Sequence, residues 1–319
     1  MAPEPDRRTG LMPAAFGLRL LYGLGWRVGP RLPNSVRQLI MKQGARIAIS
    51  RGGPHLDHYR DNLRALLGHE PDDQLLRAGV ASYLRNWIEV FSLPGWSTAR
   101  IVGTVSSTGE AELRRALREE GAVVALPHSG NWDLAGAWAC VTGMPVTTVA
   151  EQLDDPEYAA FTRFRERLGM EVISNQDPAA LSRLMAAVRQ HRVACLVADR
   201  DLLGSGLPVS WAGHPVTMPA GPAVVARRTG ASLFPMVCRF TEDGLRLDIG
   251  TPIAHRPGRA GLVAMVQDEA DYFAEHIARA PQDWHLMQPF FAAGHEPTGR
   301  ADRTGDDVDH GVEESGRDR

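Results

Sequence analysis

Residues 123–133 read Val-Val-Ala-Leu-Pro-His-Ser-Gly-Asn-Trp-Asp, so an apolar run ends directly before a cluster of polar residues. Continuous apolar runs of this length are typical of strands that are buried on both faces of a sheet. We therefore predict a buried strand over Ala122–Pro127. His128 would then lie at the carboxyl end of that strand, the edge of the sheet where α/β proteins collect their ligands.

The polar half of this stretch combines groups that suit acid–base catalysis. Ser129-Gly130 predicts a tight turn and Asn131 an N-cap, so Asp133 would lie in the first turn of a helix, folded back toward His128. A neutral imidazole can take the proton of an attacking hydroxyl, and a carboxylate on its other ring nitrogen fixes the tautomer. We predict that His128 is a general base oriented by Asp133. From this spacing alone, a capping or core histidine is an equal alternative.

From residue 101 onward, short strand-like runs alternate with helical segments, which predicts an α/β fold with a central, mostly parallel sheet flanked by helices. Residues 99–296 would form this core, after an N-terminal helical region over 1–98 and before a disordered, polar tail over 297–319. The predicted helices are Leu56–Leu67, Asp72–Phe91, Glu110–Glu120, one from Asn131, Pro156–Leu168, Pro178–His191, Pro219–Thr229 and Ala260–Ala280. Further strands are predicted over Pro145–Ala150, Glu171–Ser174, Val193–Ala198, Ser232–Phe240 and Leu245–Ile249, with a strand or loop over Leu207–Trp211.

The N-terminal region is apolar and basic, and no acidic residue occurs from Leu11 to Arg51. Such a one-sided, amphipathic segment predicts contact with an anionic membrane surface, although a helix pair packed on the body of the protein would give a similar pattern. No apolar run reaches the ~20 residues that span a bilayer, and no signal peptide is evident. We expect a peripheral protein at the cytoplasmic face of the plasma membrane.

Composition excludes several other classes. The net charge of −3 gives no general attraction to nucleic acid, and Cys140, Cys195 and Cys238 lack the spacing of a metal site or a disulfide framework. No P-loop or GxGxxG follows a predicted strand, and no GxSxG elbow of an α/β-hydrolase occurs. We expect no metal, no cofactor and no nucleic-acid partner.

Charged residues also follow two other predicted strands. Glu151 follows Pro145–Ala150, and Asp199-Arg200-Asp201 follow Val193–Ala198. We predict that these residues bind substrate and that one carboxylate of the later group assists His128. The choice among Asp199, Arg200 and Asp201 stays open.

Arginines on the helix predicted over Pro156–Leu168 offer a further binding group. Arg165 and Arg167 are candidates for holding a phosphate of a substrate, because guanidinium groups bind phosphate in a bidentate manner. A solvated helix face is the alternative for either residue.

A resemblance adds to these predictions. His128-Ser129-Gly130-Asn131-Trp132-Asp133 resembles the HX4D motif of the lysophospholipid and lipid A acyltransferase superfamily. The similarity continues, in order, through Asp199-Arg200-Asp201, Met218-Pro219-Ala220-Gly221-Pro222 and Pro281-Gln282-Asp283-Trp284-His285, and it covers roughly residues 100 to 290. Within the superfamily, these segments are most similar to the actinobacterial phosphatidylinositol mannoside acyltransferases.

The resemblance implies an enzyme that moves a palmitoyl group from acyl-CoA, a co-substrate, to a mannose hydroxyl of phosphatidylinositol mannoside. It also implies peripheral attachment to the membrane. A lysophospholipid or lipid A type acyltransferase with another glycolipid acceptor is one alternative, and a non-catalytic lipid-binding protein is another.

Overall fold

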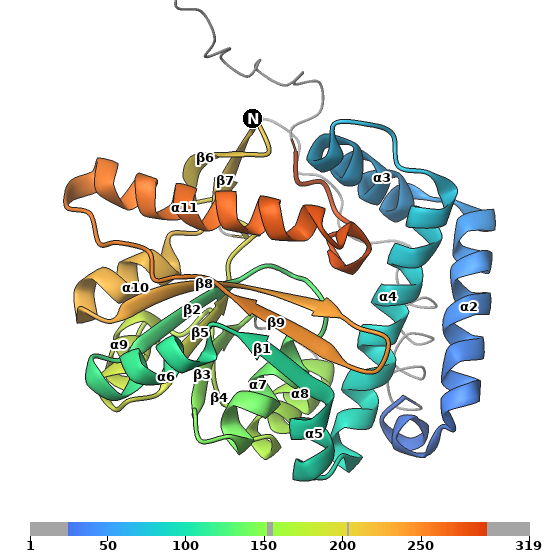
Figure 1. Cartoon of the computed structure of the whole chain (residues 1–319), viewed down its shortest axis with the longest axis horizontal. Helices are drawn as coiled ribbons and strands as arrows, with labels where there is room; N and C mark the ends of the chain where they lie inside the picture. Colours follow the sequence, from blue (N-terminus) through green and yellow to red (C-terminus); the bar gives the residue numbers. More distant parts are fainter. Residues whose placement is uncertain (1–24, 152–155, 203, 292–319) are drawn as a thin grey trace, which may run out of the picture.

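The computed structural model describes residues 25–151, 156–202 and 204–291, which form an α/β fold around a seven-stranded sheet (Figure 1). Every neighbouring pair of strands in it is parallel except β8 and β9. The predicted mostly parallel sheet is therefore confirmed. In spatial order its strands are β1 Val105–Thr108, β9 Leu245–Ile249, β8 Ser232–Phe240, β2 Ala122–Leu126, β5 Val193–Val197, β3 Val146–Ala150 and β4 Glu171–Ser174.

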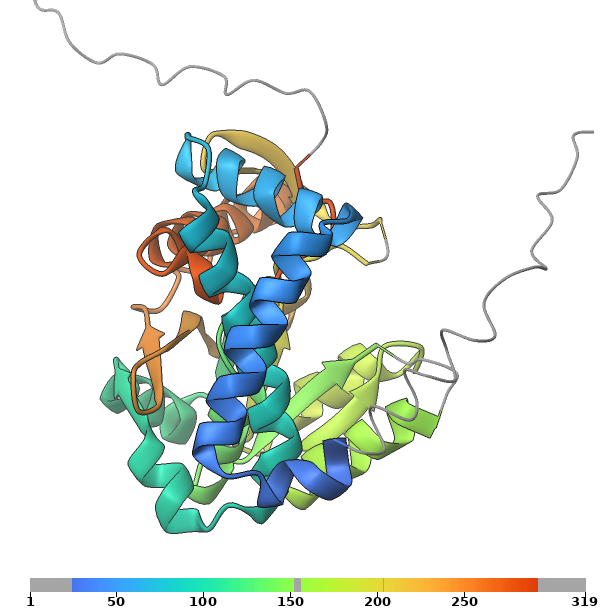
Figure 2. The same ribbon diagram turned by 90° about the vertical axis from the view of Figure 1, so that its right-hand side faces the viewer.

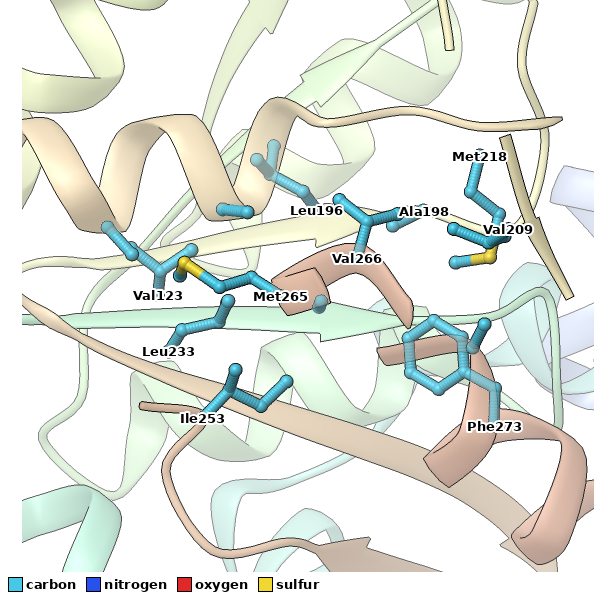
Figure 3. Packing of buried hydrophobic residues seen from close by; sticks show 14 of the residues in the cluster. Val123, Leu196, Ala198, Val209, Met218, Leu233, Ile253, Met265, Val266 and Phe273 are labelled. Atoms are coloured by element: carbon cyan, nitrogen blue, oxygen red, sulfur yellow. The ribbon is translucent and has the colours of Figure 1, made fainter. Parts of the chain in front are cut away.

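Helices cover both faces of the sheet, which explains the continuous apolar run of β2. Val123 and Ala125 point into a core built with α9 Ala180–Arg189, α10 Gly221–Thr229 and α11 Gly258–Ala278, part of which Figure 3 shows. Val124 and Leu126 point into the opposite core, built with α6 Glu110–Glu119, α7 Trp132–Val141 and α8 Pro156–Arg167. Alternate residues of one strand are thus buried in two different cores.

The segment over Leu207–Trp211, predicted as a strand or loop, is a strand, β6, which packs beside α11. It pairs in an antiparallel hairpin with β7 His214–Met218, which was not predicted. The edge strand β1 and the short helix α5 Thr98–Thr104 were also missed. These segments lack the continuous apolar run that marks β2 and β5, and at four to seven residues they are too short to show a clear periodicity.

Three helices stand beside the sheet and make up most of the N-terminal region. These are α2 Asn34–Arg51, α3 Pro54–Leu67 and α4 Asp73–Ser92, and Figure 2 shows α2 lying alongside α4. They share a small core of their own, which contains Ala45, Tyr59, Leu63, Leu76 and Val80. Short 3₁₀ turns pack against α4 or adjoin it: η1 Gly29–Arg31 before α2, η2 Leu93–Gly95 directly after α4, and η3 Pro281–Asp283 near the end of the described chain.

Several apolar residues of α2 are exposed. Val36, Leu39, Ile40 and Ile47 lie among exposed polar residues such as Lys42, Gln43 and Arg46, and Leu39 is 56% exposed. No helix within the described ranges is long and apolar enough to cross a membrane. The predicted membrane-facing segment begins upstream of residue 25, and that part, like the tail over 297–319, lies outside the described residues.

Candidate active site

The imidazole of His128 is paired with the carboxylate of Asp199. The two atoms His128 Nδ1 and Asp199 Oδ1 lie 2.5 Å apart, and the backbone N–H of His128 donates to Asp199 Oδ2 at 2.9 Å. The indole N–H of Trp284 donates to the same oxygen at 3.1 Å. Asp199 is fully buried, whereas the His128 side chain is 27% exposed. A buried carboxylate therefore holds one ring nitrogen of a histidine that remains accessible from outside.

The register of the sheet explains why these two residues meet. Strands β2 and β5 are parallel neighbours, with Leu126 opposite Val197, and Ala198 N–H donates to the Leu126 carbonyl at 2.8 Å. His128 lies two residues beyond Leu126, and Asp199 lies two residues beyond Val197. The carboxyl ends of the two strands thus deliver the imidazole and the carboxylate to the same point.

Asp199 remains a carboxylate despite its surroundings. Burial alone would raise its pKa, but the charge of His128 and the hydrogen bonds from His128 and Trp284 outweigh this and hold the pKa below its usual value. A charged Asp199 can fix the tautomer of the ring and stabilise an imidazolium when one forms.

The closing segment Asp283-Trp284-His285 braces the loop that carries His128. The N–H of His285 donates to the His128 carbonyl at 2.8 Å, and the N–H of Gly130 donates to the Asp283 carbonyl at 2.9 Å. Gly130 itself has a φ of +56°, and a Cβ there would lie 2.8 Å from the Cys238 carbonyl oxygen. Glycine is required at this turn for both reasons.

The carboxylate of Asp133 has a different partner from the one expected from the sequence. Its Oδ1 lies 2.6 Å from Arg165 Nε and its Oδ2 lies 3.3 Å from a terminal nitrogen of the same guanidinium. The expected pairing with His128 is corrected accordingly, because Asp199 occupies the imidazole Nδ1. Asn131 does cap helix α7, as predicted, through its Oδ1 and the Leu134 N–H at 2.9 Å.

A cavity of about 370 Å³ opens beside His128. This volume lies in the usual range for a small-molecule site. Trp132 packs edge-on against the His128 ring, with ring centroids 5.4 Å apart. Arg200 is a positively charged residue in the lining of this cavity, and no acidic residue within the described ranges lines it. The lining residues are His55, Tyr83, Asn86, Trp87, His128, Trp132, Arg200, His285, Leu286, Met287 and Gln288.

His285 faces the same cavity but is not suited to acid–base work. Burial and the nearby charge of His128 lower its pKa to about 3, so its ring stays neutral at ordinary pH. Its Nε2 lies 3.0 Å from the Ser82 hydroxyl, which donates to Asp283 Oδ1 at 2.6 Å. This chain ties the closing segment to helix α4.

Of the remaining predicted site residues, Glu151 and Asp201 follow the carboxyl ends of β3 and β5, whereas Arg167 ends α8 and lies toward the amino end of β4. Glu151 and Arg167 are exposed, and neither lines the His128 cavity, so their predicted role in substrate binding stays a prediction. Asp201 accepts the backbone N–H groups of Ser205 and Gly206 at 3.2 and 2.8 Å, which shapes its own loop.

Sequence reasoning missed the contribution of helix α4 to the site. Tyr83, Asn86 and Trp87 line the His128 cavity, and Glu89 accepts a hydrogen bond from Asn131 Nδ2 at 3.1 Å. The sequence predicts a helix over Asp72–Phe91 but no role for it in the site. Polar Asn86 and Glu89, which lie between apolar residues of that helix, are the signal that could have indicated one.

The fold and the site together define an acyltransferase of a known family. The chain matches the model of the bacterial lipid A biosynthesis acyltransferases over residues 7–292, and it belongs to that family.

Two curated proteins are similar to this chain along most of its length, and both carry the name of one particular acyltransferase. The phosphatidylinositol mannoside acyltransferase of Mycolicibacterium smegmatis is 40% identical over 280 residues, which cover 85% of this chain and 90% of that protein. The phosphatidylinositol mannoside acyltransferase of Mycobacterium tuberculosis strain H37Rv is 38% identical over 294 residues, which cover 88% of this chain and 90% of that protein.

Proposed function

We propose that this enzyme transfers a palmitoyl group from acyl-CoA to a mannose hydroxyl of phosphatidylinositol mannoside, with His128 as the general base. The observation that carries the mechanism is the His128–Asp199 pair beside an open cavity of about 370 Å³. The acceptor is inferred from the names of relatives that are 38–40% identical along most of the chain.

The reaction needs no covalent intermediate with the enzyme. In the proposed step, His128 Nε2 takes the proton of the sugar hydroxyl as its oxygen attacks the thioester carbonyl carbon. The C–S bond then breaks, and the imidazolium returns the proton to the leaving thiolate. Because Asp199 holds Nδ1, the ring presents Nε2 with its lone pair free for the hydroxyl.

Asp133 would support this base from a distance. Its bidentate contact with Arg165 joins the first turn of α7 to helix α8, beside the loop that carries His128. Arg200 in the cavity wall is our candidate for holding a phosphate or a developing oxyanion.

The acyl chain would enter on the α7 side of the sheet. Trp132 lines the His128 cavity and also a small cavity of about 50 Å³ between α7 and β3. A further space of about 30 Å³, bordered by Trp138, shares Gly136, Val146 and Cys195 with that cavity. Apart from Asp133 and Arg165 the lining is mostly apolar, and these spaces would have to widen to receive a long acyl chain.

Membrane attachment would be peripheral and at the cytoplasmic face. The support is the four exposed apolar residues of α2 together with the absence of acidic residues from Leu11 to Arg51. Both substrates of the proposed reaction carry acyl chains, so attachment would bring the catalytic cavity to them.

An acceptor panel tests this proposal. Purified enzyme is given palmitoyl-CoA, and release of the free thiol is followed with phosphatidylinositol mannoside, a lysophospholipid or a lipid A precursor as acceptor. We expect the mannoside to give the highest kcat/KM. A higher value with either other acceptor would leave the acyltransferase mechanism intact but reject the proposed substrate, and no turnover with any acceptor would favour a lipid-binding protein.

A further inference from the structure

A second cavity lies on another side of helix α4 from the His128 cavity. It has a volume of about 610 Å³ and is bounded by α2, α4, Phe240 and Asp283. We call it the α2–α4 groove, and Figure 2 shows the two helices side by side. Its lining residues are Gln38, Met41, Lys42, Ala45, Arg46, Arg77, Ala78, Ala81, Ser82, Arg85, Phe240 and Asp283.

The charge of the groove is one-sided. Four of its lining residues are cations and one, Asp283, is an acid. That acid is already used, because Asp283 accepts the Ser82 hydroxyl at 2.6 Å and the Phe240 N–H at 2.7 Å. Arg77 is paired with Asp73, so the positive charge available to a ligand comes from Lys42 and Arg46.

Two of the cations have no partner within the described part of the chain. Lys42 and Arg46 make no hydrogen bond and no ion pair there. Arg85, in contrast, is committed to Glu89 and to the carbonyls of Thr241 and Gly244. Lys42 and Arg46 lie one turn apart on the same side of α2, so they can bind one group together.

The groove is open because several of its lining residues have small side chains. Ala45, Ala78 and Ala81 line the groove, where longer residues at these positions would fill it. Met41 and Phe240 add apolar surface. The lining of the groove thus includes both apolar and cationic side chains. This combination suits an anionic lipid, which has an apolar part, better than a free inorganic ion.

The groove adjoins exposed apolar residues of α2. Leu39, Lys42 and Arg46 lie at positions i, i+3 and i+7, so they form one row along the helix. Leu39 is 56% exposed. An anionic head bound at Lys42 and Arg46 would therefore have its acyl chains beside the apolar residues of α2.

We propose that the α2–α4 groove binds the phosphate of an anionic bilayer phospholipid, distinct from the acceptor at the His128 cavity. Ser82 and Asp283 line this groove and also brace the loop that carries His128. The bound lipid would hold the enzyme at a fixed depth in the membrane surface. Ser82 and Asp283 would then connect the lipid site to the loop that carries His128. The inference rests on the proposed membrane attachment but not on the acyl-transfer reaction.

The test uses dihexanoyl phosphatidylglycerol below its micelle concentration and isothermal titration calorimetry, without any acyl donor. We expect saturable binding to the wild-type enzyme, at least about tenfold weaker binding of dihexanoyl phosphatidylcholine, and no comparable binding of inorganic phosphate. The double substitution Lys42→Gln and Arg46→Gln should weaken binding by about tenfold or more, since both charged contacts are lost.

Two further variants separate the groove from general surface charge. Arg118→Gln with Arg189→Gln removes the same charge from α6 and α9, at the opposite end of the molecule from α2 (Figure 1), and should leave binding unchanged. Ala81→Leu fills the groove without changing charge and should weaken binding, with thermal unfolding as the folding control. Equal losses in the two charge doubles, or wild-type binding by the groove double, would overturn the proposal. So would inorganic phosphate binding as tightly as the phosphatidylglycerol.

Discussion

Asp199 is the carboxylate on which the proposed base depends. It accepts three hydrogen bonds, two from His128 and one from Trp284, and it has no exposure to solvent. Asp199→Asn keeps the shape but removes the charge that fixes the tautomer. We expect kcat for thiol release to fall by about 10³- to 10⁴-fold, with little change in KM. A folded variant with near wild-type kcat would contradict this role.

The partners of the two aspartates can be separated by double-mutant cycles on the free energy of unfolding. Asp199 should couple to His128, and Asp133 should couple to Arg165, each by about 1 kcal/mol or more, because each pair is in direct contact. The cycle for Asp133 and His128 should give less than about 0.5 kcal/mol. A coupling there as large as that of Asp199 would restore the pairing first predicted from the sequence.

Glu269 is a buried acid that the proposed reaction does not use. It lies on α11 with no exposure, and neither carboxylate oxygen has a hydrogen-bond partner within the described ranges. Burial, with a smaller contribution from the charge of Asp268, raises its pKa well above the usual value. The folded protein therefore holds this proton to higher pH than the unfolded chain does.

The sign of the resulting pH dependence follows from that difference. Below the ordinary pKa of about 4.5 both states are protonated, and the neutral acid costs the fold no ionisation energy. As the pH rises above this value, the unfolded chain ionises and stability falls by about 1.4 kcal/mol per pH unit from this group, until Glu269 ionises in the fold. Glu269→Gln should remove this contribution to the pH dependence. The free energy of unfolding of the variant should therefore fall less between pH 5 and pH 8 than that of the wild type. Parallel curves for the two proteins would contradict the assignment.

At the scale of elements, helices α3 and α4 approach each other closely at a glycine. A Cβ on Gly79 would lie 2.0 Å from the hydroxyl of Tyr59, a fully buried residue of α3. Gly79→Ala should therefore destabilise the fold by about 1–3 kcal/mol through overpacking, despite the better helix propensity of alanine. Gly103→Ala in α5 is the matched control, since no atom lies within 4 Å of its Cβ position. That change should be neutral or stabilising by up to about 1 kcal/mol.

Chemical denaturation of the two glycine variants measures this difference directly. Destabilisation by Gly103→Ala equal to that by Gly79→Ala would indicate a general intolerance of alanine in helices, and it would reject the specific contact between α3 and α4.

At the scale of the whole molecule, the sequence predicted the elements better than their contacts. The apolar run over 122–127 favours a buried strand, which β2 Ala122–Leu126 confirms, so the position of His128 at its carboxyl end was predictable. The partner of His128 was not, because it depends on which strand lies beside β2 and in which register. Asp133 is five residues from His128 and Asp199 is 71 residues away, yet the sheet brings the distant residue into contact.

The same reason explains the other residues that were missed. Helix α4 lines the catalytic cavity from more than 40 positions upstream of His128, and Trp284 reaches Asp199 from 85 positions downstream. The α2–α4 groove depends on how two amphipathic helices pack, which small residues such as Gly44 and Ala45 determine only in three dimensions. A local sequence pattern predicts on which face of a helix or strand a residue lies. A site, in contrast, is formed where the faces of several helices and strands meet.

The central claim is that His128 removes a proton from the acceptor hydroxyl, and His128→Ala tests it most directly. Thiol release from palmitoyl-CoA in the presence of phosphatidylinositol mannoside is compared for the two proteins, with thermal unfolding as the control for folding. We predict a loss of kcat of at least about 10⁴-fold in a variant that is still folded at the assay temperature, although losing the contact with buried Asp199 lowers its unfolding midpoint. A folded variant that transfers the acyl group at the wild-type rate would contradict it.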